Sequence, residues 1–268
     1  MTLDQQAPIG IFDSGIGGLT VVSAIRKHLP NESLVYLGDT ARVPYGTKSA
    51  ETVVRYANEC ADFLLGRGVK AIVVACNTAS AYALDDLTRR LNVPVLGVIE
   101  PGARAALAAS SNKVVGVVGT QGTVQSNAYG KALKSIDENV RVVSRACPLF
   151  VPLVEEGWVD NEVAAAAVKR YLNGIGDEGV DALVLGCTHY PLLANTIREQ
   201  LGPGITLVDS AETTAGELMR LLEARECKSN GDRESSCRFY VTDLPARFET
   251  IARRFLGEDL PAVTRVDL

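Results

Sequence analysis

Two segments of this chain repeat one pattern, in which an apolar run ends on a small residue and is followed by a cysteine and polar side chains. Cys76 follows the first run, at residues 70–75, and Cys187 follows the second, at residues 181–186. Such runs are typical of buried strands in a parallel sheet. Ligands of open α/β sheets bind just beyond the carboxyl ends of these strands. The pattern therefore predicts two thiols in equivalent positions, which suits a reaction that needs one acid and one base on opposite faces of a substrate.

Strand-like and helix-like segments alternate along nearly the whole chain. This alternation predicts parallel sheets with helices on both faces, and so an α/β fold. The pattern restarts near Glu100-Pro101-Gly102, so we expect two similar α/β domains with mainly parallel sheets flanked by helices, rather than one wide sheet. The first domain is predicted to contain residues 1–99, completed by residues 210–268, and the second to contain residues 100–209.

The individual elements are predicted from apolar spacing and from turn-forming residues. Strands are expected at residues 9–13, 33–37, 93–98, 114–118, 140–146, 183–185, 205–208 and 238–242, and in the run before Cys76. Helices are expected at residues 19–28, 79–91, 103–110, 161–172, 192–201 and 245–255. A further long helix is expected after a cap at Thr47 or Ser49, and another is expected to begin at about residue 123. Residues 226–236 are predicted to be a loop, and Asp209-Ser210 a second break between the domains.

The composition indicates a globular protein and excludes several classes of function. The net charge of −5 comes without a cluster of Lys or Arg, so no nucleic-acid partner is expected. Residues 1–8 lack the cationic and apolar parts of a signal peptide, and no apolar run approaches the roughly 18 residues that span a bilayer. We therefore expect a cytoplasmic protein that does not enter a membrane. Its six cysteines are then expected to be reduced thiols, and the absence of C-x-x-C pairs predicts no structural metal site.

Polar residues next to the two cysteines could activate their thiols. A thiol with a pKa near 8.5 is mostly protonated at neutral pH and needs a neighbour that takes its proton. His189 is one of only two histidines and lies two residues after Cys187. Asp13 ends the first predicted strand, where it could either cap a helix or assist Cys76.

Further polar residues follow predicted strands at the same edge. The glycine-rich turn at residues 14–18 exposes backbone N–H groups, but it matches neither a Walker phosphate loop nor a dinucleotide fingerprint. Tyr45 and Gly46 follow the second strand, and Thr120 and Thr123 follow the strand at 114–118, which makes all four candidate substrate contacts. Glu155 and its neighbours are expected to form a loop.

Five motifs, spread in order along the chain, carry a resemblance to a known family. They are Gly10 to Gly18, Pro44 to Gly46, Cys76 to Ser80, Gly186 to Pro191 and Val208 to Ser210. In these residues the chain resembles the glutamate racemases, the cofactor-independent amino-acid racemases of bacterial cell-wall synthesis in the aspartate/glutamate racemase family. The stretch after about residue 226 carries no such motif.

The resemblance implies a mechanism in a cleft between two α/β domains. One thiolate removes the α-proton of glutamate, and the opposite thiol protonates the other face. By analogy Cys76 and Cys187 take these roles, Asp13 assists Cys76, and both His189 and Glu155 assist Cys187. The resemblance implies that the substrate contacts are Asp13, Ser14, Tyr45, Gly46, Asn77, Thr78, Thr120, Thr123 and Thr188.

The resemblance also implies a role and leaves alternatives open. It implies that the protein supplies D-glutamate for peptidoglycan synthesis and that it uses no cofactor. Its expected partner is a small-molecule substrate, and a homodimer is compatible with the resemblance. The nearest alternative is an aspartate racemase of the same two-cysteine type, because one methylene separates the two substrates. Other classes are a periplasmic-type binding protein, a cysteine hydrolase that uses Cys187 with His189, and a metal site formed by Cys76, Cys187, His189 and a further ligand.

Overall fold

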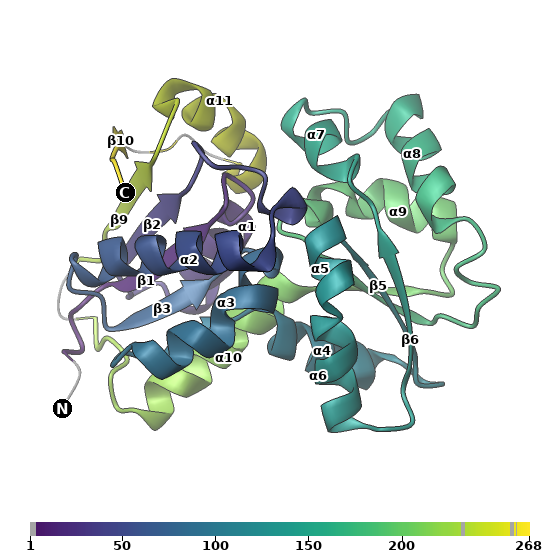
Figure 1. Cartoon of the computed structure of the whole chain (residues 1–268), viewed down its shortest axis with the longest axis horizontal. Helices are drawn as coiled ribbons and strands as arrows, with labels where there is room; N and C mark the ends of the chain where they lie inside the picture. Colours follow the sequence, from purple (N-terminus) through teal and green to yellow (C-terminus); the bar gives the residue numbers. More distant parts are fainter. Residues whose placement is uncertain (1–3, 232–233, 258–259, 261) are drawn as a thin grey trace.

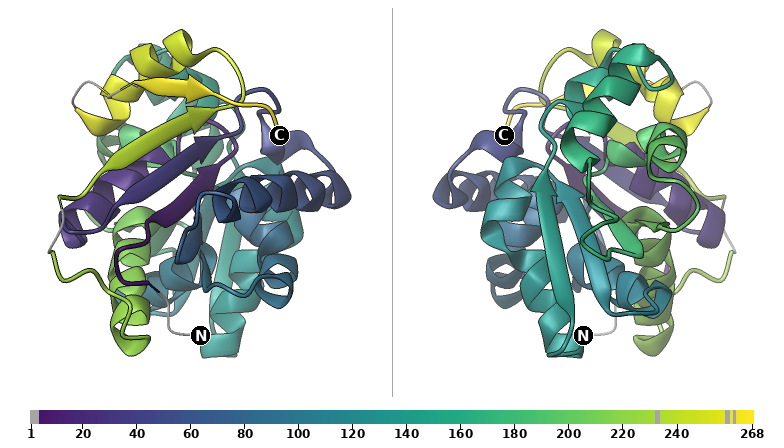
Figure 2. Two further views of the ribbon diagram at one scale, coloured as in Figure 1. Left: turned by 90° about the vertical axis from the view of Figure 1, so that its left-hand side faces the viewer. Right: turned by 90° about the vertical axis from the view of Figure 1, so that its right-hand side faces the viewer.

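The chain forms two parallel β-sheets that lie side by side, with helices packed around them (Figure 1). The structure is a computed structural model that describes residues 4–231, 234–257, 260 and 262–268. Figure 2 shows the strands of the first sheet from one end of the molecule and those of the second sheet from the other. This arrangement confirms the predicted α/β class with parallel sheets flanked by helices.

The first sheet has six strands in the order β10-β9-β2-β1-β3-β4, and all neighbouring strands are parallel. Strands β1, β2 and β3 are buried over their full length, which explains why their sequences are continuously apolar. The strands are β1 (Ile9–Asp13), β2 (Leu34–Gly38), β3 (Ala71–Val74), β4 (Val95–Gly97), β9 (Cys237–Val241) and β10 (Val263–Arg265).

The second sheet has four parallel strands in the order β6-β5-β7-β8. The inner strand β7 is fully buried, whereas the edge strand β6 carries exposed positions. The strands are β5 (Val114–Gly119), β6 (Arg141–Ala146), β7 (Ala182–Gly186) and β8 (Thr206–Asp209).

Helices cover the sheets and also contact one another across them. α2 packs on α3, α1 on α10 and α11, and α8 on α9. None of the helices in the described residues has the length and apolar character needed to cross a membrane. The helices are α1 (Leu19–His28), α2 (Ala50–Leu65), α3 (Asn77–Arg90), α4 (Ile99–Ala109), α5 (Gln121–Ser126), α6 (Ala128–Ile136), α7 (Phe150–Glu155), α8 (Glu162–Leu172), α9 (Ala194–Leu201), α10 (Ser210–Ala224) and α11 (Pro245–Leu256), with 3-10 turns η1 (Tyr45–Thr47) and η2 (Tyr190–Leu193).

Two helices that pack on each other, α4 and α10, connect the sheets. Residues 100–102, where the break between the domains was predicted, lie in the first turn of α4. Pro101 is tolerated there because the N–H groups of a first turn have no partner within the helix. Asp209, at the second predicted break, caps α10 by accepting a hydrogen bond from the Ala211 N–H at 2.8 Å.

Several other elements differ from their predictions. α3 begins at Asn77 rather than at 79, because Cys76 rather than a later residue is its N-cap. Glu155 is the last residue of α7, so the loop predicted around it is wrong there. The helix α10 and the short strand β10 were not predicted. The predicted loop at 226–236 has no helix or strand at 226–231 and 234–236, and residues 232 and 233 lie outside the described residues.

Candidate active site

The two sheets each present one cysteine just beyond the carboxyl end of an inner strand. Cys76 lies two residues beyond β3, and Cys187 follows β7 directly. The repeated sequence pattern thus corresponds to equivalent positions in two sheets. Each cysteine is only 6% exposed, so a group that reacts with either thiol does so largely away from water.

Cys76 lies at the N-terminus of α3, beside the end of β1. Its Sγ donates a hydrogen bond to Ser14 Oγ at 3.6 Å. Burial raises the pKa of the Cys76 thiol to about 11, and the negative charge of Asp13 raises it as well. The Ala79 N–H in the first turn of α3 opposes this rise in pKa, because a free N–H stabilises a thiolate.

Cys187 lies beside His189, whose Nδ1 is 3.9 Å from the Cys187 Sγ. Burial raises the pKa of the Cys187 thiol well above its ordinary value, while the backbone N–H of His189 lowers it. The charges of Cys76, Asp13 and Glu155 each raise the Cys187 pKa further. A negative charge on one thiol therefore disfavours a negative charge on the other.

Asp13 is fully buried and acts electrostatically on both thiols. Its Oδ2 accepts a hydrogen bond from the Gly15 N–H at 3.0 Å, and its Oδ1 accepts one from the Thr188 hydroxyl at 3.4 Å. Burial raises the pKa of Asp13, against the opposing influence of His189 and of these hydrogen bonds. The residue expected to assist Cys76 thus also contacts the segment that carries Cys187.

His189 connects Cys187 to Glu155. While its Nδ1 faces the thiol, its Nε2 lies 3.2 Å from Glu155 Oε1. The hydrogen bond with His189 lowers the pKa of Glu155, although burial opposes this effect. The structure therefore brings these three residues together in the order thiol, imidazole and carboxylate. A neutral imidazole carries one N–H, so this arrangement can hold a proton on either side of the ring.

Three threonine hydroxyls lie within hydrogen-bond distance of one another where the starts of α3 and α5 meet. The Thr78 Oγ1 lies 2.8 Å from that of Thr120 and 3.2 Å from that of Thr123, and the last two are 3.0 Å apart. Thr78 lies in the first turn of α3, whereas Thr120 caps α5. Gly46 lies against this group, because a Cβ at Gly46 would be only 2.6 Å from the Thr120 Cβ. The predicted contacts Gly46, Thr78, Thr120 and Thr123 are therefore brought together.

Asn77 presents a buried amide group with an unused donor. It is 2% exposed, and its Oδ1 accepts a hydrogen bond from the Tyr129 hydroxyl at 2.7 Å. Its Nδ2 has no hydrogen-bond partner among the described residues. A buried donor without a partner is costly, and a bound ligand could satisfy it. Sequence reasoning missed Tyr129, because nothing local marks a tyrosine that orients a residue 52 positions away.

The side chain of Tyr45, a predicted substrate contact, is buried and hydrogen-bonded to other buried residues. Its hydroxyl donates to Asp39 and lies 3.8 Å from the Cys60 Sγ, and the residue is 1% exposed. Its ring packs at 5.6 Å from that of Tyr56. The phenol therefore belongs to the core and anchors the turn that carries Gly46.

The site gathers donors with little formal positive charge. Within the part of the chain that the structure describes, no group of three or more His, Cys, Asp or Glu side chains is arranged to hold a metal ion. Cys76, Cys187 and His189 therefore do not form the ligand set that the metal-site alternative requires. The site instead contains two buried thiols, with Asp13 acting on both and with His189 and Glu155 beside Cys187.

Known proteins match the chain over nearly its full length. The profile of the Asp/Glu/Hydantoin racemase family matches residues 19–218, a range that includes both cysteines. A glutamate racemase from Geobacter metallireducens is 55% identical over 260 residues, which is 97% of this chain and 96% of that protein.

Solved structures agree with this match. The crystal structure of a glutamate racemase from Bacillus anthracis is 44% identical, with a TM-score of 0.95 and 98% of each chain covered. That of a glutamate racemase from Francisella tularensis in complex with D-glutamate is 38% identical, with a TM-score of 0.92 and 98% of each chain covered. The chain therefore belongs to the Asp/Glu/Hydantoin racemase family.

Proposed function

We propose that this protein is a glutamate racemase that interconverts L- and D-glutamate by proton transfer between Cα and two thiols. The observation that carries this proposal is the pair of buried, electrostatically coupled cysteines at equivalent strand ends of two sheets. Glutamate is the favoured substrate because relatives at 38% to 55% identity are glutamate racemases, one of which binds D-glutamate.

The proposed reaction moves one proton off Cα and another onto it. The thiolate of one cysteine takes the α-hydrogen and becomes a thiol, while the electron pair stays on Cα. The thiol of the other cysteine then gives its hydrogen to the opposite face and becomes a thiolate. A thiolate whose conjugate acid has a raised pKa is a stronger base, which suits a weak carbon acid.

Each thiol needs a neighbour that can hold its proton. Because burial raises the pKa of Asp13, this carboxyl group can hold a proton closer to neutral pH than an exposed aspartate can. We assign Asp13 to Cys76, and we assign His189 and Glu155 to Cys187. The Nδ1 of His189 is 3.9 Å from the Cys187 Sγ in the protein without substrate, a distance that can shorten in a substrate complex.

The carbanion would be stabilised by donors placed before the reaction begins. The unpartnered Nδ2 of Asn77 and the hydroxyls of Thr78, Thr120 and Thr123 are donors of this kind. Ser14 contacts Cys76, Gly46 lies against Thr120, and Thr188 contacts Asp13. Fixed dipoles in a buried site stabilise developing charge without reorganisation. No pyridine ring or metal ion is required in this scheme.

Circular dichroism of amino acids incubated with the purified enzyme tests the substrate. We expect L-glutamate and D-glutamate to lose their optical signal completely, and L-aspartate to keep it. Loss of the aspartate signal with retention of the glutamate signal would instead establish the alternative, an aspartate racemase.

Single cysteine variants test the roles of the thiols. We expect Cys76→Ala and Cys187→Ala each to abolish racemisation while the fold is kept. Cys147→Ala is a matched control, because this thiol is also fully buried but lies outside the proposed site. Full racemisation activity in either active-site variant would exclude the two-thiol reaction.

The wider setting follows from the same proposal. D-glutamate produced in the cytoplasm would supply peptidoglycan synthesis. The two sheets would mark two domains, residues 1–99 with 210–268 and residues 100–209, which enclose the substrate between them. A homodimer is a further prediction, which sedimentation velocity tests.

A further inference from the structure

The last helix of the chain reaches from the first sheet to the residues beside Cys187. α11 follows β9, a strand of the first sheet, and packs on α1. Its far end lies opposite α7, at the top of the molecule in Figure 1. α7 ends at Glu155, the residue that hydrogen-bonds to His189. A helix attached to the first sheet, α11, therefore lies against a helix attached to the second sheet, α7.

Arg254 of α11 holds the end of α7. Its Nη1 donates a hydrogen bond to the backbone oxygen of Glu155. The guanidinium lies against Gly157, where a Cβ would be 2.9 Å from the Arg254 Cζ. Gly157 has a φ of +77°, so the chain turns there in a conformation that favours glycine. A cation that donates to a carbonyl at a helix C-terminus is also favoured by the helix dipole.

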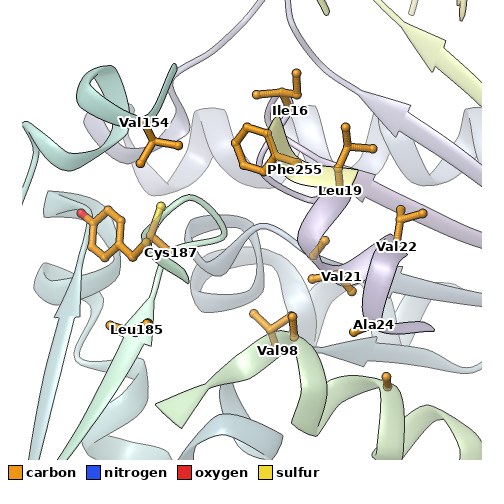
Figure 3. Packing of buried hydrophobic residues seen from close by; sticks show 14 of the residues in the cluster. Ile16, Leu19, Val21, Val22, Ala24, Val98, Val154, Leu185, Cys187 and Phe255 are labelled. Carbon is orange, nitrogen blue, oxygen red and sulfur yellow. The ribbon is translucent and has the colours of Figure 1, made fainter. Parts of the chain in front are cut away.

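Phe255, the next residue of α11, holds the imidazole. Its ring lies 5.5 Å from the ring of His189 at an interplanar angle of 89°, an edge-to-face contact. Phe255 is 8% exposed and belongs to the same apolar cluster as Cys187, Val154 and Ile16 (Figure 3). Two adjacent residues of one helix therefore contact the two members of the Glu155–His189 pair, one each.

We propose that Arg254 and Phe255 are positioning residues that fix the Glu155–His189 pair against Cys187, so that proton transfer at this thiol depends on the docking of α11. This proposal rests on the proposed racemase function. Arg254 fixes the backbone from which the Glu155 carboxylate extends, and Phe255 limits the rotation of the ring that lies between carboxylate and thiol. Neither residue contacts the Cys76 side of the site in the described hydrogen bonds and ring contacts.

This one-sided position gives the proposal a specific kinetic signature. The two enantiomers have equal free energies, so any variant must change kcat/KM by the same factor in both directions. The isotope effect with α-deuterated substrate need not stay equal. If the step at Cys187 becomes slower, the isotope effect grows for the enantiomer whose proton Cys187 removes. It falls for the other enantiomer, because its deprotonation at Cys76 then precedes the slow step.

The experiment compares Arg254→Met and Phe255→Leu with the wild type and with Arg253→Met, which removes the same kind of side chain from the neighbouring exposed position. We expect Arg254→Met and Phe255→Leu to lower kcat/KM by about 10- to 100-fold, the range that misplacement of a reacting group can cost. Their isotope effects should split between L- and D-[2-²H]glutamate. Arg254→Lys should recover part of the loss, and Arg253→Met should behave as the wild type.

The possible results separate this inference from the proposed function. Wild-type enzyme without racemisation of either glutamate enantiomer would refute the proposed function. Active wild-type enzyme together with variants whose isotope effects stay equal would overturn only the positioning role. Thermal unfolding of each variant checks the fold, and Arg254→Lys keeps the test valid if Arg254→Met does not fold.

Discussion

At the scale of single residues, burial determines the acid–base behaviour of the two thiols. Both Cys76 and Cys187 are almost fully covered, and burial is the largest cause of the rise in pKa at each. The negative charge of Asp13 raises both pKa values further. The site thereby disfavours a negative charge on both thiols at once, which suits a reaction in which one cysteine is the thiolate base and the other the thiol acid.

The raised pKa of Cys76 predicts a loss of stability at alkaline pH. In the unfolded chain this thiol ionises near its ordinary pKa of about 8.5, whereas in the folded protein its pKa is about 11. Between these values the folded state binds more protons, so the free energy of unfolding falls as the pH rises. We expect the wild type to lose about 2 kcal/mol relative to Cys76→Ser between pH 8 and pH 10.5.

Urea unfolding of the two proteins at both pH values measures this difference. The serine hydroxyl does not titrate in this range, so the variant serves as the reference. Equal changes in the free energy of unfolding would show that Cys76 ionises as readily in the folded protein as in the unfolded chain.

The unpartnered amide of Asn77 predicts a large catalytic effect. Asn77→Ala removes a donor that we assign to the developing negative charge, and loss of one such donor costs about 10²- to 10³-fold in kcat. Tyr129→Phe is the control, because it removes only the hydroxyl that orients Asn77. We expect a smaller loss from Tyr129→Phe in the racemisation assay. The assignment fails if Asn77→Ala stays within twofold of the wild type.

At the scale of elements, the buried inner strands were predicted better than the short helices and the edge strand around them. The buried strands β1, β3, β5 and β7 have apolar runs that end on small or polar residues, so local sequence defines both the strand and its functional edge. The short helix α7 and the edge strand β10 lack such a signal, because six and three residues are too few to show a period. The helical end at Glu155 was missed for this reason.

Contacts between elements predict opposite effects for two glycine variants. A Cβ at Gly46 would meet the Thr120 side chain at 2.6 Å, so Gly46→Ala must separate η1 from α5. We expect a destabilisation of about 1–3 kcal/mol and a fall in kcat/KM. Gly216, inside α10, has open space where its Cβ would be, so Gly216→Ala should stabilise by about 0.5–1 kcal/mol.

Thermal unfolding of both variants, together with racemisation assays, checks this pair. Gly216→Ala should also keep full activity, since α10 gains only helix propensity. A stable and fully active Gly46→Ala protein would show that η1 and α5 need not touch.

At the scale of the whole molecule, the site is assembled from segments that are distant in sequence. The repeated cysteine pattern predicted one thiol at each strand end, and the motifs that follow it indicated Asn77, Thr188 and His189. The contact of α11 with Glu155 and His189 joins residues 66 to 99 positions apart, and no local pattern encodes it. Sequence could therefore predict the residues that we assign to the reaction, but not the residues of α11 that we propose to align them.

Racemisation in D₂O tests most directly whether two thiols act on opposite faces of one carbon. Each enantiomer of glutamate is incubated with the wild-type enzyme, and both isomers are analysed by mass spectrometry at low conversion. We predict that the newly formed enantiomer carries deuterium at Cα, while the remaining substrate keeps its protium. Product that retains the original α-hydrogen, or deuterium that enters substrate and product equally, would show that a single base serves both faces and would contradict the account.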